Sequence, residues 1–592
     1  MSTVTNAPQL RWTLRDWLAA AGLFLATTAV VLWQNAHLTV LWDMSYVLET
    51  STRIAQGQMP YRDFPLAHAP LAFLIQAAII RLTGRVFFHH VLYAAAMGGL
   101  GTVISWRIAL NILRPRMMAA WAVALLLSVP LAVLGIYCIL PLPSYDCDCA
   151  LSILVALCLL QRLTPDPRPR PLRGFAAGAA LCLPLFFKQN MGLPFLASAI
   201  AVILLLMGVG VFRVKHPLTP RAETAALLPV LAGVVATLMA AALLLHFTVG
   251  LGNYIHWTFQ FAAQRRMPGL HDMLAVYRDP FLLWTLPSVA AALLLMRSPL
   301  IKARWAQLAS FFLLASPFLF VLCSLFLYDD ADERGDSLLA LWPMLLVLSA
   351  AMAVFMIFKL RRSLCLRALL PLILLATING TMLSQQLWGS TYAIWPLLIL
   401  LLAEMIAFIS VFNLPGILNA VPRVFAPFLA AVAAVTLLVC GGFYTASEER
   451  LSYVQLPELP ARHSALPQLA GMAVSGPFLP DFEELLQFAS ANIPASDGLI
   501  LMPGEDPFFF VTGRVPAFPV LLFDPATDPY TPAQVVEQAR LHRIRWLIVK
   551  RELQINEDPT PQREATMKAL LVDFTLSHQL RAYDVYRRTG GN

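Results

Sequence analysis

The stretch WDMSYVLETSTRIAQGQMPYRDFPLAHAPL, residues 42–71, follows one apolar segment directly and precedes a long series of others. It carries acids, bases and prolines, whereas the neighbouring segments are almost entirely apolar. The prolines at 60, 65 and 70 stiffen the backbone and remove hydrogen-bond donors, so we expect an ordered segment. A long loop among otherwise short connections is usually functional when it is ordered. This segment is therefore the first place to look for a site.

The rest of the 592-residue chain has the composition of an integral membrane protein, with 59% hydrophobic and 13% charged residues. An apolar helix of about 20 residues crosses a bilayer. The sequence predicts about thirteen crossings, near 16–35, 86–106, 118–137, 144–163, 174–187, 191–212, 224–249, 281–296, 306–327, 337–358, 368–386, 391–412 and 424–444. The shorter apolar run 70–83 contains Arg81 and is followed by Gly84, so we predict a re-entrant or interfacial segment there.

The distribution of charge gives the orientation, because Lys and Arg collect in cytoplasmic loops. With thirteen crossings, one side receives twenty basic residues before position 446, and the other receives nine basic and twelve acidic residues. We therefore predict a cytoplasmic N-terminus in the plasma (inner) membrane and a large external loop at 36–85. The net charge of +8 follows from the cytoplasmic loops. It indicates topology and membrane lipids as neighbours, and it gives no reason to expect a nucleic-acid partner.

The composition changes after the last predicted span. Residues 446–592 hold 13 basic and 18 acidic residues and no apolar run of span length. We predict a transmembrane domain at 1–445 and a small, soluble, external α/β domain at 446–592. The segment DFEELLQFASANI (481–493) has helical periodicity, and 497–503 and 544–550 resemble short buried strands. We find no nucleophile, metal or phosphate-loop motif in this domain.

Within the opening stretch, MSYVLETSTRIAQ (44–56) favours a helix, and Gly57 stands where a C-cap glycine belongs. Asp43 then has two interpretations. It is a helix N-cap, or it is a functional acid at the membrane interface beside Trp42. The residues alone leave both open.

The same stretch resembles the first external loop of the C-type polytopic glycosyltransferases (GT-C). An acid, Asp43, follows the first span, a G-x-x-P-Y-x-D-F motif comes next, and Pro70 and Leu71 open the following apolar helix. The motif residues are Gly57, Pro60, Tyr61, Asp63 and Phe64. The family includes the protein O-mannosyltransferase and aminoarabinose-transferase branches. The two adjacent acids typical of protein mannosyltransferases are absent, because Met44 follows Asp43.

The resemblance implies an inverting transfer of a sugar from a polyprenyl-phosphate carrier to an acceptor on the external face. Such a reaction needs a general base for the acceptor hydroxyl and cations for the leaving phosphate. The resemblance implies that Asp43 is the base and that Asp146 is the second acid of the site, although an N-cap role remains the alternative for Asp146 too. Asp146 and Asp148 are about 200° apart on a helix, so only one faces a pocket shared with Asp43.

Lys188 and Gln189 interrupt apolar sequence at the external end of two spans, where an ionisable residue is by default a functional candidate. The resemblance assigns Lys188 to the carrier phosphate, and snorkelling to the interface is the alternative. The remaining predicted substrate or carrier contacts are Arg265, Arg266, Arg334, Arg62, Asp63, Tyr61 and His68. Ordinary lipid phosphates would satisfy Arg265 and Arg266 equally well. No cofactor or metal is required, although Asp43 and Asp146 could share a divalent ion.

Three other functions remain as alternatives to a glycosyltransferase. A transporter or flippase of lipid-linked saccharide would carry paired charges or broken helices at mid-membrane and internal repeats, which the sequence does not favour. An O-antigen ligase or polymerase would share this topology but use a diphosphate-linked donor. A structural protein with an envelope-binding tail would not need Asp43. The acceptor of a transferase would be an envelope glycan, a lipid or a protein.

The charge distribution predicts that a reporter fused after Asn592 lies outside the cell. Reporters active only in the periplasm and only in the cytoplasm, fused at the same position, measure this directly. A cytoplasmic signal would contradict the thirteen-span arrangement.

Overall fold

The computed structural model describes residues 12–37, 41–163, 171–212, 220–266, 269–360, 365–383, 393–411, 425–447, 459–524, 527–551 and 561–589. Before residue 446 all of the named elements are helices. They are α1 (Leu14–Asn35), α2 (Leu41–Ala55), α3 (Leu71–Thr83), α4 (Phe87–Leu113), α5 (Ala120–Ser128), α6 (Leu131–Leu134), α7 (Tyr145–Gln161), α8 (Pro171–Phe187), α9 (Gln189–Phe212), α10 (Pro220–Thr248), α11 (Leu251–Ile255), η1 (His256–Phe261), α12 (Ala262–Arg266), α13 (Leu270–Met273), η2 (Ala275–Arg278), α14 (Leu282–Arg297), η3 (Pro299–Lys302), α15 (Arg304–Leu327), α16 (Ala331–Leu339), α17 (Leu341–Leu360), α18 (Leu366–Thr381), α19 (Trp395–Val411) and α20 (Phe425–Thr445).

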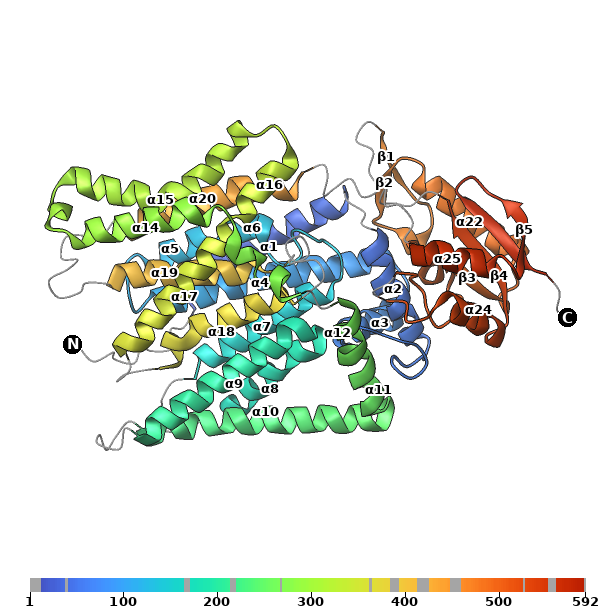
Figure 1. The fold of residues 1–592 in the computed structure, drawn as a ribbon, viewed down its shortest axis with the longest axis horizontal. Coiled ribbons are helices and arrows are strands. Elements are labelled where there is room, and N and C mark those ends of the chain that lie inside the picture. The colour runs from blue at the N-terminus through green and yellow to red at the C-terminus, as the bar shows by residue number, and fades with distance from the viewer. Residues whose placement is uncertain are drawn as a thin grey trace.

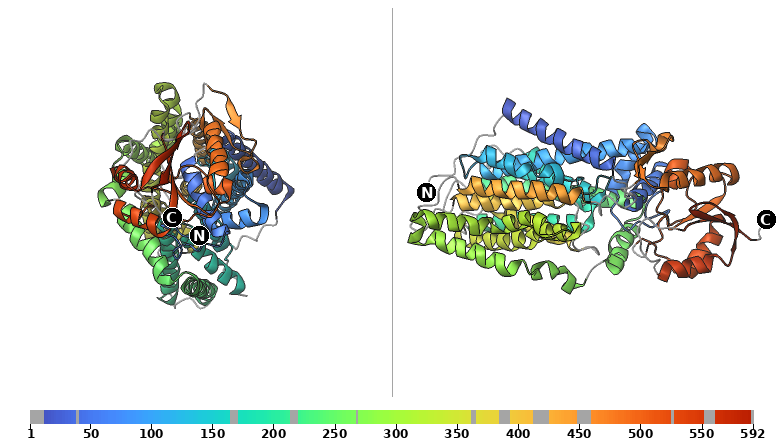
Figure 2. Two further views of the ribbon diagram at one scale, coloured as in Figure 1. Left: turned by 90° about the vertical axis from the view of Figure 1, so that its right-hand side faces the viewer. Right: turned by 90° about the horizontal axis from the view of Figure 1, so that it is seen from above.

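The long helices form one elongated bundle, and the carboxy-terminal domain lies beyond one end of it (Figures 1 and 2). Helices α2 and α3 lie at that same end, between the bundle and the domain (Figure 1). Arg81 of α3 donates from Nε to the Ala55 carbonyl at 2.8 Å and from an η nitrogen to the Ile54 carbonyl at 3.0 Å, which joins the two helices. The run 70–83 is thus a short helix packed on α2 at the end of the bundle.

Within the described part of the chain, each of the thirteen predicted spans overlaps at least one helix. Among the described residues, seven helices are long and apolar enough to cross a membrane, and six shorter apolar helices accompany them. The predicted span 118–137 is broken, because Pro130 separates α5 from α6. The number thirteen therefore stays a prediction, whereas the polytopic helical fold is confirmed.

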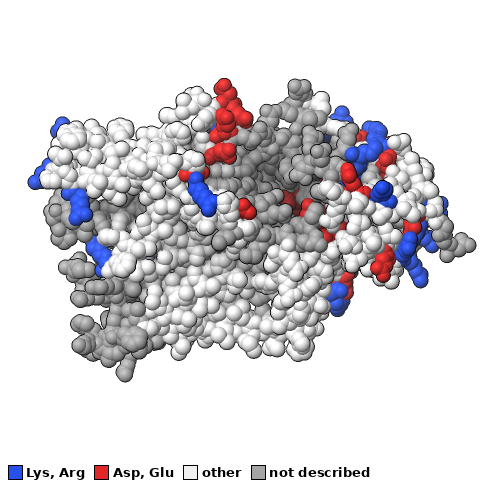
Figure 3. Space-filling model, in the orientation of Figure 1, with Lys and Arg blue, Asp and Glu red and all other residues white. Residues whose placement is uncertain are grey.

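The surface charge of the bundle fits a membrane protein. On the face shown in Figure 3, a belt with almost no charged side chains separates basic groups at one end of the bundle from the charged groups nearer the carboxy-terminal domain. Many large apolar side chains are exposed on the long helices, among them Leu25 (63%), Phe247 (79%) and Phe326 (88%). Lipid solvates such surfaces, whereas a soluble protein rarely exposes contiguous apolar area of this extent.

The carboxy-terminal domain is built on a four-stranded sheet in the order β3-β4-β6-β5, with β3 and β4 parallel and the other pairs antiparallel. Its elements are β1 (Ala461–His463), η4 (Pro467–Leu469), β2 (Ala473–Ser475), α22 (Phe478–Asn492), β3 (Gly498–Met502), α23 (Phe508–Thr512), α24 (Pro532–Leu541), β4 (Ile544–Lys550), α25 (Pro561–Leu570), β5 (Phe574–Gln579) and β6 (Tyr583–Arg588). The predicted helix 481–493 and strands 497–503 and 544–550 correspond to α22, β3 and β4.

The central strands β3 and β4 are buried on both faces. One face contributes Leu499, Leu501 and Ile548 to an apolar core, and the other contributes Ile500 and Leu547 to a second core. Consecutive strand residues point to opposite faces, so the continuous apolar sequence of β3 reflects burial on both sides. The first core also contains Met44 of α2 and Phe87 of α4, so it crosses from the domain into the membrane part.

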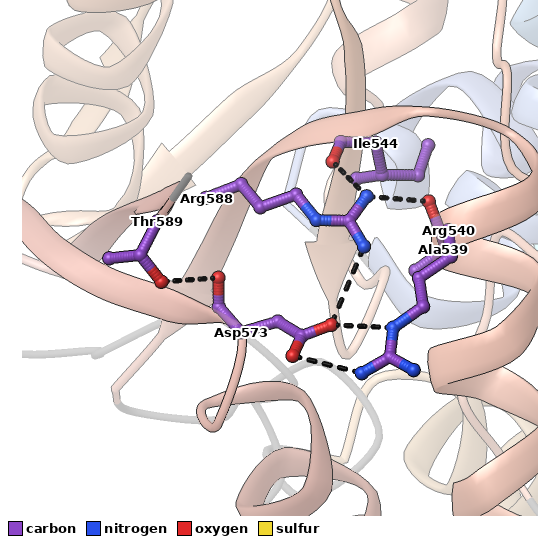
Figure 4. Close-up of polar contacts among 6 residues, drawn as sticks. All are labelled: Ala539, Arg540, Ile544, Asp573, Arg588 and Thr589. Carbon is purple, nitrogen blue, oxygen red and sulfur yellow. Dashed lines mark hydrogen bonds and ion pairs between the residues drawn. The ribbon is translucent and has the colours of Figure 1, made fainter. Parts of the chain in front are cut away.

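Two arginines and Asp573 form an ion network in the carboxy-terminal domain (Figure 4). Asp573, just before β5, accepts from Arg540 Nε at 2.8 Å and from a second Arg540 nitrogen at 3.0 Å. Arg588, at the end of β6, reaches the same carboxylate at 3.4 Å. Arg540 and Arg588 hold the pKa of Asp573 below its usual range.

We expect Asp573→Ala to lower the thermal unfolding midpoint of the full chain by roughly 2–4 °C, because exposed ion pairs contribute about 0.2–1 kcal/mol each. Since the folded pKa is depressed, this contribution is present at neutral pH and is lost as the pH falls through that pKa. Differential scanning fluorimetry at pH 7 and pH 3 measures both effects, with Glu537→Ala on exposed α24 as the control. An unchanged midpoint at pH 7 would show that the ion network does not stabilise the domain.

Candidate active site

Asp43 lies inside the first turn of α2, which begins at Leu41. The N-cap interpretation of Asp43 is therefore wrong, because an N-cap precedes the first helical residue. An acid in a first turn is favoured by the helix dipole, and Asp43 is half-buried. Tyr46, three residues further on, lies on the same face of α2 as Asp43.

Tyr46 connects this face to the proline-rich loop. Its hydroxyl lies 3.0 Å from His68 Nδ1, and the two rings are 5.5 Å apart. The loop segment is fixed from the other side by Tyr61, whose hydroxyl donates to the His68 carbonyl at 2.7 Å. Tyr61 is 3% exposed, and its backbone has a φ of +67°. Because its buried side chain also bonds to the His68 carbonyl, it holds the loop in one conformation. His68 is likewise buried and central to the packing.

The loop then meets the ends of the apolar helices that lie nearest the carboxy-terminal domain. The His68 ring stacks on Tyr145, the first residue of α7, with centroids 4.3 Å apart. Lys188 Nζ lies 5.2 Å from the centre of the Tyr145 ring and forms an ion pair with Asp146. The side chains of Lys188 and Asp146 are only 12% and 11% exposed. A chain of direct contacts therefore runs from the Asp43 face of α2 to this buried ion pair.

Asp146 is not the cap of α7. Ser144 takes that place, and its hydroxyl accepts from the Asp146 N–H at 3.3 Å. The Asp146 carboxylate is thereby released from capping and pairs with Lys188. Lys188 does not snorkel to solvent, because its ammonium is held in this pair.

Asp148 points elsewhere. Its carboxylate accepts from the hydroxyl groups of Tyr93 at 2.8 Å and Tyr137 at 2.6 Å. The rotation of about 200° between Asp146 and Asp148 accounts for their separate partners. Asp148 anchors α7 to α4 and to the segment before α7, which fixes the rotation of Asp146.

Gln189 ties three segments together beside Lys188. Its amide nitrogen donates to the Ala67 carbonyl at 3.2 Å and to the Thr258 carbonyl at 2.9 Å. Thr258 belongs to the π-helical segment η1, and π-helical turns often occur at functional sites. Because both bonds use backbone carbonyls, the geometry favours Gln189 as a positioning residue rather than as a phosphate contact.

Arg62, Asp63 and Arg334 have other partners in the structure. Arg62 and Asp63 pair with each other at 2.8 Å on an exposed turn, and Asp63 also accepts from the Met59 N–H at 2.7 Å. Arg334 donates to the Tyr328 carbonyl at 2.8 Å, across the turn between α15 and α16. Arg265 and Arg266 lie in α12, and their side chains are outside the described residues. Substrate contact by these five residues stays a prediction.

Tyr46, Tyr93 and Tyr137 are not among the residues that the sequence patterns predict for the site. Tyr46 could have been predicted, because a helix places a residue three positions after Asp43 on the same face. Tyr93 and Tyr137 come from separate segments, and no local pattern joins them to Asp148. Among the described residues, no group of three or more His, Cys, Asp or Glu side chains is placed to hold a metal ion.

No protein-family model matches the chain, and no curated protein matches it. Among solved structures, the chain is similar to ArnT from Cupriavidus metallidurans bound to undecaprenyl phosphate, with 13% identity over 97% of this chain and 98% of that chain and a TM-score of 0.45. It is also similar to the Archaeoglobus fulgidus oligosaccharyltransferase in complex with Zn and sulfate, with 12% identity over 89% of this chain and 68% of that chain and a TM-score of 0.47.

A third similar structure is the archaeal oligosaccharyltransferase AglB from Archaeoglobus fulgidus with an inhibitory peptide and a dolichol-phosphate. Its identity is 10%, over 91% of this chain and 70% of that chain, with a TM-score of 0.44. These likenesses are distant, with a TM-score below 0.5 in all three cases.

The buried ion pair makes a prediction about stability. We expect Lys188→Met to destabilise the protein by about 3–5 kcal/mol, because it leaves a buried carboxylate without its partner. The double variant Lys188→Met/Asp146→Asn should recover most of that loss, since neither group then carries a charge. Thermal unfolding of all four proteins in nanodiscs measures the coupling. Additive effects of the two substitutions would show that the side chains do not interact.

Proposed function

We propose that the protein is a membrane glycosyltransferase that moves a sugar from a polyprenyl-phosphate carrier to an acceptor on the external face, with inversion. The observation that carries the proposal is the Asp146–Lys188 pair, buried where α7 meets α9 and reached from the Asp43 face of α2 through Tyr46, His68 and Tyr145. An ionisable pair at the end of apolar helices is costly and marks a site.

Lys188 is the proposed ligand of the carrier phosphate. Its ammonium already faces an anion, the Asp146 carboxylate, so the local structure is built to hold positive charge at this point. A lipid phosphate entering from the bilayer meets this charge at the membrane surface. The ammonium then stabilises the charge that develops on the phosphate as the sugar leaves, which is the largest single contribution to many such reactions.

Asp43 is the proposed general base. In the transfer, the acceptor oxygen bonds to the anomeric carbon while the bond from that carbon to the phosphate oxygen breaks. The acceptor proton passes to Asp43, and the electron pair of the broken bond remains on the phosphate beside Lys188. A single displacement of this kind inverts the anomeric centre, because the acceptor attacks opposite the leaving group.

The experiment that tests the function offers donors to the purified protein in nanodiscs. A panel of undecaprenyl-phosphate-linked and undecaprenyl-diphosphate-linked sugars is incubated with envelope glycan, lipid and peptide acceptors, and products are identified by mass spectrometry. Transfer from the monophosphate donors supports the proposal. Transfer from diphosphate donors alone identifies a ligase or polymerase, and movement of intact donor across liposomes without transfer identifies a flippase.

We expect Asp43→Asn to lower kcat by about 10²-fold or more, the scale of a lost general base, with little change in binding of undecaprenyl phosphate. Lys188→Ala should weaken that binding and lower kcat together, because the phosphate loses its cation. Asp329→Asn, an exposed acid before α16, serves as the matched control. Wild-type kcat in Asp43→Asn would remove Asp43 as the base.

A further inference from the structure

Helix α2 lies between two partners. One side carries the Tyr46 contact to His68 described above, and another side contacts the carboxy-terminal domain. There, the Glu49 carboxylate accepts from the Phe510 N–H at 3.1 Å, and the Ser45 hydroxyl donates to the Glu505 carbonyl. Arg53 donates to the Pro519 carbonyl at 2.7 Å. These residues, Ser45, Glu49 and Arg53, are buried and form what we call the docking face of α2.

The docking face is reinforced by apolar packing. Met44 and Leu48 of α2 are each 1% exposed and belong to the same apolar core as Phe508 and Phe510 of α23. From the neighbouring segment, Arg85 donates to the Phe510 carbonyl at 2.9 Å. A shared core of this kind differs from the polar, mobile contact between tethered domains. The carboxy-terminal domain therefore holds α2 in one orientation.

The loop that receives α2 is itself held firmly. It follows β3 and contains Glu505 and Asp506, which both pair with Lys550 at the end of β4, at 3.2 Å and 2.8 Å. Tyr583, at the start of β6, donates to Asp506 at 2.9 Å. Gly504 has a φ of +96°, and a Cβ there would lie 1.9 Å from the Leu521 carbonyl oxygen. Three strands therefore fix the loop against which α2 packs.

Glu49 has a second property that a purely structural contact does not need. It is 3% exposed, and its second carboxylate oxygen makes no hydrogen bond in the described part of the chain. Burial raises the pKa of Glu49 to about 8, with Asp506 raising it further and the Phe509 and Phe510 N–H groups and Arg53 opposing the shift. The charged groups that face it are Arg53 on α2 and Asp506 on the domain, with Glu505 and Lys550 directly behind Asp506.

We propose that Glu49 is a positioning residue for the transfer: by docking α2 on the carboxy-terminal domain, it sets the place of Asp43 and Tyr46 against the Asp146–Lys188 pair. This inference rests on the proposed function. The domain is then a part of the catalytic assembly, although it supplies no reacting group. Six positions separate Asp43 from Glu49, so a rotation of α2 about its axis moves Asp43 directly.

The test compares Glu49→Ala with the conservative Glu49→Gln in nanodiscs. The donor is the one that the wild type uses in the donor panel, and undecaprenyl phosphate is the binding probe. We expect Glu49→Ala to lower kcat by about 10-fold or more through misplacement of the base, with the Kd of undecaprenyl phosphate within about 2-fold of wild type. Glu49→Gln keeps an oxygen acceptor for the Phe510 N–H and should restore most of kcat. Glu537→Ala and Glu537→Gln, on exposed α24, are the matched controls.

The pH dependence of kcat gives a second readout. The docked state holds a proton on Glu49 that an exposed glutamate, with a pKa of 4.5, releases, so docking weakens as the pH rises from 4.5 towards 8. The ratio of wild-type to Glu49→Gln kcat should therefore fall between pH 6 and pH 9. Hydrogen–deuterium exchange over residues 41–56 should rise in Glu49→Ala and, in the wild type, with pH after correction for the intrinsic rate.

The outcomes separate this inference from the function on which it rests. Absence of transfer by the wild type with every donor overturns the proposed function and this inference with it. Wild-type transfer combined with an unchanged kcat in Glu49→Ala overturns this inference alone. A loss of kcat in Glu49→Ala that goes with an equal loss of undecaprenyl phosphate binding, or that Glu49→Gln does not restore, also overturns it, because a general structural defect would have that effect.

Discussion

The ion pair between Lys188 and Asp146 constrains the end of the bundle that lies nearest the carboxy-terminal domain. Charges placed at the ends of apolar helices require partners, and these two are nearly buried. Satisfying them requires α7 to present one particular face to the junction of α8 and α9. Ser144 starts α7 so that Asp146 is free of capping, and the tyrosines on Asp148 fix its rotation. The ion pair therefore depends on several weaker contacts, which set where α7 begins and how it is rotated.

The proline-rich loop transmits this constraint to α2. His68 lies between Tyr46 and Tyr145, and Tyr61 and Gln189 hold the backbone on either side of it. Prolines reduce the number of conformations that the loop must lose on ordering, so such a shape costs less entropy than an equally long flexible loop. Aromatic and imidazole rings suit the membrane interface, because they combine apolar faces with polar edges. The loop is thus a rigid connector rather than a flap.

Many of the helices and strands could be predicted from sequence, and there is a physical reason why the remaining contacts could not. Span positions, the carboxy-terminal domain and the helix after Asp43 follow from local hydrophobicity and periodicity. The start of α2 at Leu41 and the cap at Ser144 were missed, because boundaries depend on contacts that shift a helix by one or two residues. The pairing of Asp146 with Lys188 joins residues 42 positions apart, and the contact of Glu49 with Phe510 joins residues 461 positions apart. No local pattern encodes such separations.

The buried polar groups also show why the carboxy-terminal domain does not behave as an independent appendage. An amphipathic helix such as α2 needs a partner for each buried face, and the described residues of the membrane part cover the face that carries Tyr46. Without the domain, Met44, Leu48 and the Glu49 carboxylate would face water, and burial of each apolar side chain is worth about 1.5–3 kcal/mol. The helix that carries Asp43 is therefore completed by residues more than 450 positions away. The proposed site is then complete only when both domains have folded and docked, so the orientation of Asp43 depends on the carboxy-terminal sheet.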